Sequence, residues 1–359
     1  MEEPRVDPDI RRARTLPSSW YSDSTIFDQL ISKFSSHWHF AGHESDLGEN
    51  NAIPLPHFEG QTREPLLMAR TENGLNCISN VCTHRGMVIQ SEPCDGNVLQ
   101  CPYHGRTFDL NGIFRNMPAF ENIEDFPTKD DNLKQFPTGD WNGLIFASIN
   151  PEKSFEEWIQ PVRERMSWWA ECKEMKRDLS RDRDWIIETN WALYVDNYLE
   201  GFHIPFVHAD LNSVLDYNDY TTELFDGGVL QIGIASEGEP FFDIPESSPD
   251  HGKKIAAYYW WLFPGLMLNI YPWGVSVNIV VPEAVDKTRV IYQGYVTDPE
   301  MLGRGAGGDL DKVEIEDQFV VEGCLRGVKS SAYDRGRYSP KMERGVHHFH
   351  RMLTKGRLS

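Results

Sequence analysis

The sequence predicts an α+β fold in which a small all-β unit is inserted into a larger mixed unit with a central antiparallel sheet and flanking helices. Two observations carry this prediction. Between about residues 38 and 150, glycine, proline and short alternating apolar runs such as "EPLLMAR" and "GNVLQCPY" are dense, which is typical of short strands joined by turns. From residue 154 onward, segments with helical spacing alternate with apolar strands.

The expected elements follow this division, with boundaries at 1–35, 36–152 and 153–359. The first segment is a lead-in that packs on the larger unit and contains a helical stretch within 24–38. Further helices are expected at 154–175, 190–203, 312–331 and 343–356. Strands are expected at 227–236, at 288–296, and within the uncharged run 255–282, whose prolines and glycines argue against a membrane helix.

Composition narrows the classes of partner. The chain has 359 residues and a formal net charge of −20, which speaks against nucleic acid or an anionic membrane as partner and is compatible with a cationic ligand. The N-terminal segment "MEEPRVDPDIRRARTLPSSW" has no apolar stretch of the kind a secretion signal needs. Six scattered cysteines fit a reducing compartment. We therefore expect a cytoplasmic protein that is not bound to a membrane.

Two short loops each carry one cysteine and one histidine. Cys82 precedes His84 as C-x-H, and Cys101 precedes His104 as C-x-x-H. A zinc site can use this ligand set, but zinc fingers group cysteine with cysteine and histidine with histidine. A [2Fe–2S] cluster of the Rieske type needs two thiolates on one iron and two imidazoles on the other. The spacing favours the cluster over zinc, and over two unrelated turns with buried cysteines.

The residues around these loops agree with a cluster. Gly86 and Gly105 allow tight turns, and Pro118 is expected on a third loop that covers the cluster. Tyr103 can donate a hydrogen bond to a cluster sulfur. Plain turn and packing roles remain the alternative for these four residues.

A second histidine pair lies in "DNYLEGFHIPFVHAD". On a helix, Asp196, Glu200 and His203 would share one stripe, and Pro205 should end the helix so that His208 returns beside His203. Two histidines and a carboxylate form the facial triad of non-haem Fe(II) oxygenases. Spacing leaves the third ligand open among the acidic residues of the late helix, which are Glu314, Glu316, Asp317 and Glu322. The cluster His347, His348 and His350 is expected to pack or face solvent.

These motifs resemble the large (alpha) subunit of Rieske non-haem iron oxygenases over nearly the whole chain, and most closely the choline-monooxygenase and carnitine-oxygenase branch. The resemblance makes 36–152 the Rieske [2Fe–2S] domain and 153–359 the mononuclear iron catalytic domain. It implies that Cys82, His84, Cys101 and His104 hold the cluster, and that His203, His208 and Asp317 hold one Fe(II).

The resemblance also implies an electron path and an assembly. Electrons would come from NAD(P)H through a separate flavin and iron–sulfur reductase. Glu200 would be the bridging carboxylate, and in a ring of three subunits His104 of one subunit would approach Glu200 of the next. Two departures stand out: Arg106 replaces the tryptophan common after "YHG", which would alter the reductase docking surface, and Glu200 replaces aspartate.

The function expected from the sequence is hydroxylation or N-demethylation of a small quaternary-ammonium compound with O2. Aromatic side chains of the uncharged run would cage the cation, although core packing is the alternative for them; they are Tyr258, Tyr259, Trp260, Trp261, Tyr271 and Trp273. Asp196 would assist the cation or support His203. Two alternatives remain, which are an aromatic ring-hydroxylating dioxygenase acting on an aromatic acid and a non-catalytic electron-transfer protein.

Overall fold

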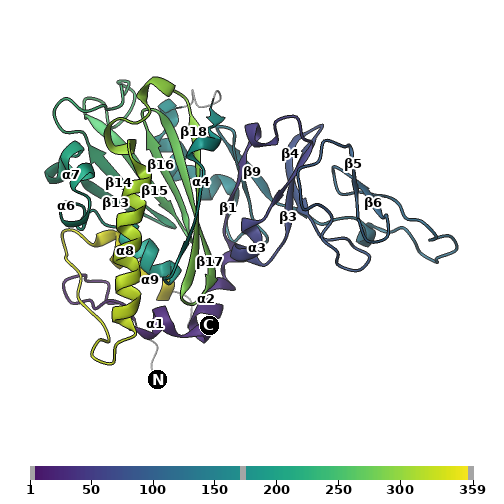
Figure 1. Cartoon of the computed structure of the whole chain (residues 1–359), viewed down its shortest axis with the longest axis horizontal. Helices are drawn as coiled ribbons and strands as arrows, with labels where there is room; N and C mark the ends of the chain where they lie inside the picture. The colour runs from purple at the N-terminus through teal and green to yellow at the C-terminus, as the bar shows by residue number, and fades with distance from the viewer. Residues whose placement is uncertain (1–4, 170–174, 355–359) are drawn as a thin grey trace. The chain divides into compact units, whose positions relative to one another are not determined.

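The computed structural model describes residues 5–169 and 175–354, and the chain divides into two compact units (Figure 1). One unit is Ser32–Gln160. The other joins Met1–Ile31 to Pro161–Ser359. The smaller unit is built almost wholly of short strands, and the larger one combines an antiparallel sheet with helices, so the α+β expectation is confirmed.

The smaller unit contains three small antiparallel sheets, with strand orders β1-β10-β9, β2-β3-β4-β8 and β5-β6-β7. The strands are β1 (His39–His43), β2 (Ala52–Leu55), β3 (Leu66–Thr71), β4 (Gly74–Ser79), β5 (Val98–Gln100), β6 (Thr107–Asp109), β7 (Phe114–Asn116), β8 (Gln135–Phe136), β9 (Thr138–Trp141) and β10 (Leu144–Ala147). One buried core of this unit packs Leu67, Ile78, Leu99 and Phe108 against the two loop cysteines. The loops therefore rest on a packed sheet core rather than on mobile chain.

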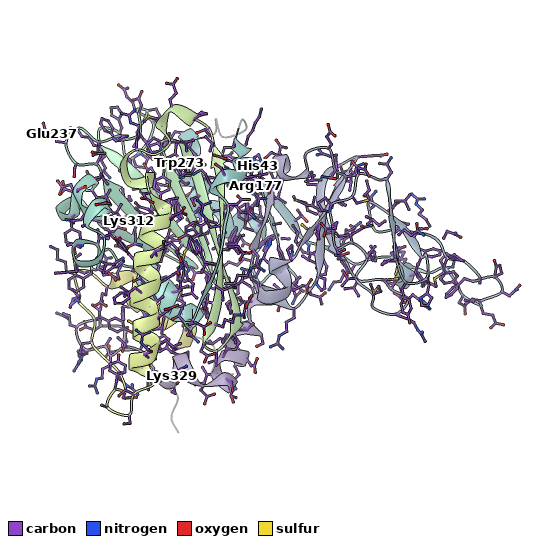
Figure 2. The ribbon with its side chains drawn as sticks, viewed as in Figure 1. His43, Arg177, Glu237, Trp273, Lys312 and Lys329 are labelled. Atoms are coloured by element: carbon purple, nitrogen blue, oxygen red, sulfur yellow. The ribbon has the colours of Figure 1, made fainter. Side chains whose placement is uncertain are left out.

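The larger unit is organised around one eight-stranded sheet of order β11-β18-β17-β16-β15-β14-β13, with β12 also paired to β18. The strands are β11 (Lys176–Arg177), β12 (Arg183–Ile187), β13 (Thr221–Phe225), β14 (Gly228–Ile234), β15 (Ile255–Leu262), β16 (Leu266–Tyr271), β17 (Gly274–Ala284) and β18 (Lys287–Val296). The central strands β15, β16 and β17 are buried along nearly their whole length. Trp273, which is labelled in Figure 2, lies at this sheet. Polar side chains on these strands are therefore exceptional.

The helices are short apart from one. They are α1 (Ser19–Ser22), α2 (Ser24–Ile31), α3 (His57–Thr62), α4 (Phe155–Arg165), α5 (Trp191–Tyr198), α6 (Ile204–Val207), α7 (Ala209–Val214), α8 (Leu310–Val328) and α9 (Arg344–Thr354). Single 3-10 turns lie at Phe34–Ser36, Glu44–Leu47, Lys129–Asp131, Leu179–Arg181, Tyr217–Asp219, Pro299–Met301 and Gly305–Gly307.

The long helix α8 lies along the sheet of the larger unit (Figure 1). The side chain of Asp309 caps its N-terminus by accepting a hydrogen bond from the backbone N–H of Lys312. Figure 2 marks Lys312 near the start of this helix and Lys329 at its end. No helix within the described ranges is both long and apolar enough to cross a bilayer.

Two helix predictions differ from the structure. The helix expected at 190–203 ends at Tyr198, and a turn, α6 and α7 follow it. The helix expected at 154–175 ends at Arg165, while residues 170–174 lie outside the described ranges, as do residues 355 and 356 of the last predicted helix. Helix ends depend on caps and tertiary packing, which periodicity does not report.

Candidate functional site

The two cysteine–histidine loops fold in the same way. The backbone N–H of Gly86 donates to the carbonyl of Cys82, and that of Gly105 donates to the carbonyl of Cys101, both at 3.0 Å. Both glycines have positive φ, 71° and 72°, which a side chain would strain. In each loop the cysteine N–H also donates, at 2.8 Å, to the carbonyl five residues later. The loops thus present their cysteine and histidine in equivalent positions.

The four side chains of these loops gather at one place. Cys82 and Cys101 are both 2% exposed, and the ring centroids of His84 and His104 lie 4.9 Å apart. The two sulfurs are buried, the imidazole of His84 is half-buried and that of His104 is exposed, and two thiolates with two imidazoles are the donor set that a Rieske cluster requires. Pro118 lies 3.6 Å from the position of a Cβ on Gly105, which places the "RNMPAF" segment beside the loop.

Two neighbours of the loops have roles that the sequence did not show. Tyr103 is 55% exposed, and its ring stacks on that of His104 at 3.7 Å. Arg106 is only 2% exposed, because its guanidinium pairs with Asp131 at 2.7 Å and lies 4.8 Å from the ring centre of Phe114. The enclosed guanidinium of Arg106 does not itself face a docking partner, and an effect of this residue on the reductase docking surface stays a prediction.

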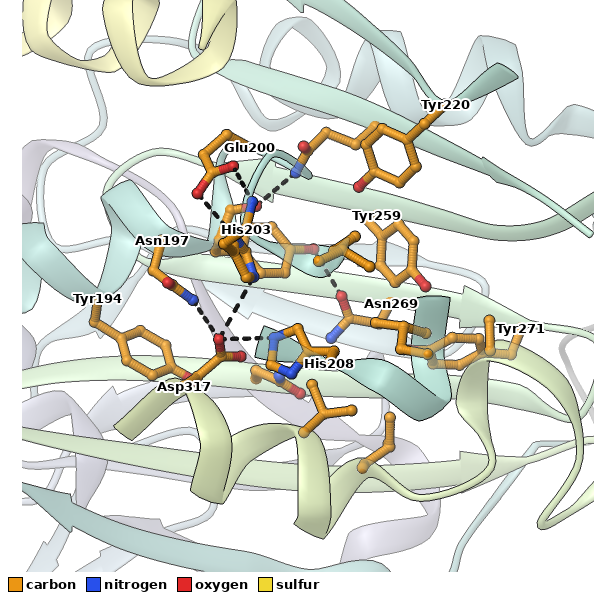
Figure 3. Close-up of a pocket in the computed structure, with 18 of the residues that line it drawn as sticks. Tyr194, Asn197, Glu200, His203, His208, Tyr220, Tyr259, Asn269, Tyr271 and Asp317 are labelled. Carbon is orange, nitrogen blue, oxygen red and sulfur yellow. Dashed lines mark hydrogen bonds and ion pairs between the residues drawn. The ribbon is translucent and has the colours of Figure 1, made fainter. Parts of the chain in front are cut away.

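In the larger unit, the second histidine pair meets a carboxylate of α8. Ligand atoms of His203, His208 and Asp317 all lie within 4.8 Å of one another. Oδ1 of Asp317 is 3.0 Å from Nε2 of His208 and 3.5 Å from Nε2 of His203 (Figure 3). The amide of Asn197, on α5, donates to the same oxygen at 2.6 Å. Two imidazoles and one carboxylate thus converge on one point, as a facial triad requires.

Each of these histidines has a carboxylate on its other ring nitrogen. Oε1 of Glu200 lies 2.7 Å from Nδ1 of His203, and Oε2 of Glu316 lies 2.7 Å from Nδ1 of His208. Such partners orient an imidazole and leave Nε2 free for a metal. Although burial opposes it, Asp317 and Glu316 raise the pKa of His208. The carboxylates around the two histidines therefore favour a positive charge at this place, and a bound divalent cation would supply one.

Local structure explains these positions. Asn190 caps α5 by accepting a hydrogen bond from the N–H of Ala192 at 2.9 Å. After α5 ends, the carboxylate of Glu200 accepts from the backbone N–H of His203 at 3.0 Å and starts the next turn. Glu200 and His203 consequently lie on a turn, so the expectation that Asp196 shares a helical stripe with them is wrong.

Asp196 is held elsewhere. Its Oδ1 lies 2.8 Å from Nε2 of His350, and its Oδ2 accepts from the hydroxyl of Tyr21 at 2.8 Å. Tyr338 completes this group, with its hydroxyl 2.6 Å from Nδ1 of His350. The described contacts of Asp196 tie α5 to α9 and α1 and do not include His203. His347 and His348 each contact a backbone carbonyl, of Asp7 and Phe225, as packing residues do.

Another buried carboxyl lies one turn before Asp317. Glu314 is fully buried, and the hydroxyls of Tyr194 and Tyr292 both donate to its Oε2. Burial raises the pKa of Glu314 to about 7. The carboxyl of Glu314 therefore packs against two tyrosines of the cavity wall. Its described contacts do not include a residue of the triad.

A cavity of about 100 Å³ opens beside the triad. Tyrosine and amide side chains form much of its wall, and Figure 3 shows several of them facing His203 and His208. The polar and aromatic wall residues are Tyr194, Asn197, Tyr198, Tyr220, Gln231, Tyr259, Asn269, Tyr271, Asn278 and Tyr292. Of the six aromatic residues expected to form a cage, Tyr259 and Tyr271 line the cavity. The other four, Tyr258, Trp260, Trp261 and Trp273, are buried outside the described lining.

Several residues of this site are not predicted by the sequence. Glu316 was one acidic residue among several, and nothing in the helix pattern singled out its contact with His208. Asn197 follows Asp196 directly, yet it is the amide that reaches Asp317. The sequence does mark Asn269 and Gln231 in one respect. Each is an amide within an otherwise apolar strand, where a buried polar side chain is unusual.

Comparisons with known proteins agree with both candidate sites. Residues 37–136 match the Rieske [2Fe-2S] domain, and residues 166–355 match the ring hydroxylating alpha subunit (catalytic domain). The chloroplastic choline monooxygenase of Arabidopsis thaliana is 29% identical over 97% of this chain and 84% of its own length. The carnitine monooxygenase oxygenase subunit of Escherichia coli (strain K12) is 26% identical over 96% of this chain and 94% of its own length.

Solved structures show the same fold. A quaternary ammonium Rieske monooxygenase, in which inter-subunit electron transfer has been described, has a TM-score of 0.78 at 24% identity, covering 97% of this chain and 96% of its own. Naphthalene 1,2-dioxygenase from Rhodococcus sp. has a TM-score of 0.74 at 18% identity, covering 95% and 93%. Because the catalytic match spans more than half of the chain, this protein belongs to the ring-hydroxylating alpha-subunit family and is a Rieske oxygenase, an oxidoreductase that uses a [2Fe–2S] cluster and a mononuclear iron.

Proposed function

We propose that this chain is the oxygenase component of an enzyme that hydroxylates or N-demethylates a small quaternary-ammonium compound with O2. The observation that carries the proposal is the triad of His203, His208 and Asp317 at the wall of a small cavity rich in tyrosine. Tyrosine rings attract ammonium cations, and the described lining of the cavity contains no lysine or arginine that would repel one. The choline and carnitine monooxygenases among its relatives support the same substrate class.

The geometry of each metal site supports an assignment of its residues. Cys82 and Cys101 would hold one iron of the cluster, and His84 and His104 the other. His203, His208 and Asp317 would hold the mononuclear iron, which, when bound, supplies open coordination positions for O2. Glu200 and Glu316 would fix the ring orientation of the two histidine ligands. The tyrosine wall would exclude water and orient the substrate carbon that is oxidised. For Asp196 we propose a structural role, because its contacts are with Tyr21 and His350.

We further propose that the protein works as a ring of three subunits supplied with electrons from NAD(P)H by a separate flavin and iron–sulfur reductase. In this arrangement Glu200 would accept a hydrogen bond from His104 of the neighbouring subunit and so join the two metal sites. Exposed apolar side chains beside the triad support an interface there; they are Phe202, Phe206, Ile315 and Phe319, with exposures of 42%, 81%, 57% and 76%. A cytoplasmic location stays a prediction, since the plant relatives are chloroplastic.

An aromatic acid fits this cavity less well. The titratable acidic and imidazole side chains of its described lining are Glu200, His203, His208 and Asp317, and that lining contains no lysine or arginine to pair with the carboxylate of an aromatic acid. The likeness to naphthalene 1,2-dioxygenase concerns the fold and does not favour that substrate class.

The direct test is turnover with a reductase and NADH on choline, L-carnitine, γ-butyrobetaine, glycine betaine and benzoate. Product, NADH consumed and hydrogen peroxide released are measured together, so that uncoupled oxidation is separated from oxygenation. We expect product from at least one quaternary-ammonium compound in proportion to the NADH consumed. Product from benzoate alone would establish the aromatic-acid alternative instead.

A further inference from the structure

The two cluster loops leave different sheets of the smaller unit. The loop that carries Cys82 follows β4, the loop that carries Cys101 lies between β5 and β6, and these strands belong to two separate sheets. The hydrogen bonds that close each loop stay within it and do not hold one loop against the other. Each iron of the cluster would take one ligand from each loop, so the two loops must keep a fixed register. A contact that joins them is therefore part of the cluster site.

The 3-10 turn Lys129–Asp131 contacts both loops. The backbone carbonyl of Asp131 accepts from the hydroxyl of Thr83, which lies within the first loop, at 2.8 Å. The guanidinium of Arg106, which follows the second loop directly, donates through Nη2 to the same carbonyl at 3.2 Å and to Oδ1 of Asp131 at 2.7 Å. The other carboxylate oxygen of Asp131 accepts from the backbone N–H of Thr128 at 2.7 Å, which fixes the turn. Asp131 thus connects the two loops.

The guanidinium of Arg106 is a buried charge. Its side chain is 2% exposed, and Nε is a buried donor without a hydrogen-bond partner among the described residues. The guanidinium lies 4.8 Å from the ring centre of Phe114 and 5.7 Å from that of Phe108, and both rings pack in the core that contains the two loop cysteines. Burying a charge costs free energy that a close partner of opposite sign offsets. A cation paired with a carboxylate therefore lies beside the thiolate side of the cluster.

We propose that Arg106 and Asp131 are positioning residues of the [2Fe–2S] cluster, which hold its two ligand loops in register and adjust its reduction potential through their opposite charges. Reduction adds an electron to the cluster, so a nearby cation favours the reduced form and a nearby anion opposes it. A tryptophan at this position, as is common after "YHG", carries no charge and cannot act in this way. The inference rests on the assignment of the four cluster ligands and is independent of the substrate.

The first test is the reduction potential of the cluster in the full chain, measured by redox titration of its visible spectrum. Arg106→Gln should lower the potential and Asp131→Asn should raise it, although both variants weaken the same contact. A merely structural role would move the two potentials in the same direction or leave both unchanged. Arg106→Lys keeps the charge, so its potential should lie close to that of the unmodified protein.

The second test is the rate at which an iron chelator removes the cluster. Arg106→Gln should lose its cluster about tenfold faster than the unmodified protein, because a charged hydrogen-bonded connection between the loops is gone. Thr83→Val removes the other half of the connection without a change of charge, so it should also lose the cluster faster and keep its potential. Arg115→Gln is the matched control, since Arg115, on β7 of the same unit, is 59% exposed and pairs with Asp109. Solvent screens that charge, and both measurements should stay close to those of the unmodified protein.

Potential shifts of the same sign in Arg106→Gln and Asp131→Asn, or a shift in Arg115→Gln as large as that in Arg106→Gln, would overturn the role of the two charges. Unchanged rates of cluster loss in Arg106→Gln and Thr83→Val would overturn the connection between the loops. If Arg106→Gln assembles no cluster, Asp131→Asn and Thr83→Val decide, and equal potentials in these two would overturn the inference. An unmodified protein without a Rieske signal would overturn the cluster assignment together with this inference.

Discussion

Two carboxylates, Glu200 and Glu316, have the same distance to a triad histidine and different proposed roles. Each lies 2.7 Å from an Nδ1 atom, of His203 and His208 respectively. Glu200 alone is proposed to join the cluster of a neighbouring subunit to the iron. Comparing the pair therefore separates orientation of a ligand from electron transfer once iron is bound, although Glu200 also accepts from the backbone N–H of His203 and Glu316 has no such role in the described part of the chain.

Glu200→Gln and Glu316→Gln test this difference. We expect both variants to lose affinity for the mononuclear iron by about 10- to 100-fold, because each removes a carboxylate from an imidazole. With iron present in excess, only Glu200→Gln should reoxidise its reduced cluster slowly when substrate and O2 are added. Stopped-flow absorbance of the cluster measures this rate. Reoxidation of Glu200→Gln at the rate of the unmodified protein would exclude the bridging role.

A buried histidine makes the smaller unit sensitive to acid. His39 is 2% exposed, its Nε2 lies 2.8 Å from the carbonyl of Phe34, and burial lowers its pKa from 6.5 to about 4. As the pH falls from 6.5 to about 4, the unfolded chain binds a proton that the folded chain does not. Stability should therefore fall by up to about 1.4 kcal/mol per pH unit in this window, and not at neutral pH.

His39→Gln removes the titration and retains a side-chain donor. Urea unfolding of the full chain, followed by the cluster absorbance at neutral pH and at about pH 5, compares this variant with the unmodified protein. The variant should lose less stability on acidification, although it can be less stable at neutral pH through altered packing. Equal losses in the two proteins would show that His39 does not carry the acid sensitivity.

At the scale of elements, the contact between α9 and the end of α5 positions the turn that carries Glu200. A Cβ at Gly345 would lie 2.3 Å from the backbone carbonyl oxygen of Leu199, so a side chain there forces the two segments apart. Gly345→Ala should cost about 1–3 kcal/mol of stability and reduce bound iron. Gly327, in the last turn of α8, has open space, and Gly327→Ala should be neutral or stabilising by up to about 1 kcal/mol.

Thermal unfolding and iron analysis of these two alanine variants check the prediction. A lower unfolding temperature for Gly345→Ala alone, together with lost iron, supports the role of the α9–α5 contact. If both alanine variants unfold at the temperature of the unmodified protein with full iron, the close contact does not position the site.

Local motifs could be predicted from the sequence, and long-range register could not. The four cluster residues and both triad histidines lie in short continuous segments whose ligand spacing is itself the signal. Asp317 lies 109 residues after His208 in the sequence, so spacing does not mark it as the third iron ligand. Only the family resemblance distinguishes it from the other acidic residues of α8. Gln231, Tyr259 and Asn269 meet in the cavity wall because three strands pair in one register, which a single sequence does not specify. The early end of α5 depended on the turn that Glu200 caps, which periodicity does not detect.

At the scale of the whole molecule, the proposed ring joins metal sites of different subunits. The predicted boundaries at residues 35 and 152 stay a prediction, because the division at residues 31 and 160 describes compactness and not independent folding. The proposal predicts complementation between two inactive chains. Cys101→Ser lacks a cluster ligand and Asp317→Asn lacks an iron ligand, so neither homo-oligomer should turn over substrate.

Oligomers that contain both variants should regain activity, since a cluster of one subunit then lies next to an iron site of another. Co-expression with two affinity tags isolates the mixed species, and a chain with both substitutions, mixed with itself, is the control. Mixed oligomers that bind both metals and remain inactive would contradict electron transfer between subunits.

The most direct measurement for the central claim is the iron content and electron paramagnetic resonance spectrum of the dithionite-reduced protein, compared with Asp317→Asn. Two metal sites predict about three iron atoms per chain in the unmodified protein, two in the cluster and one at the triad. Asp317→Asn should lose about one iron and retain the signal of a reduced Rieske cluster. Equal iron in both proteins, or zinc without an iron–sulfur signal, would contradict the two-site account.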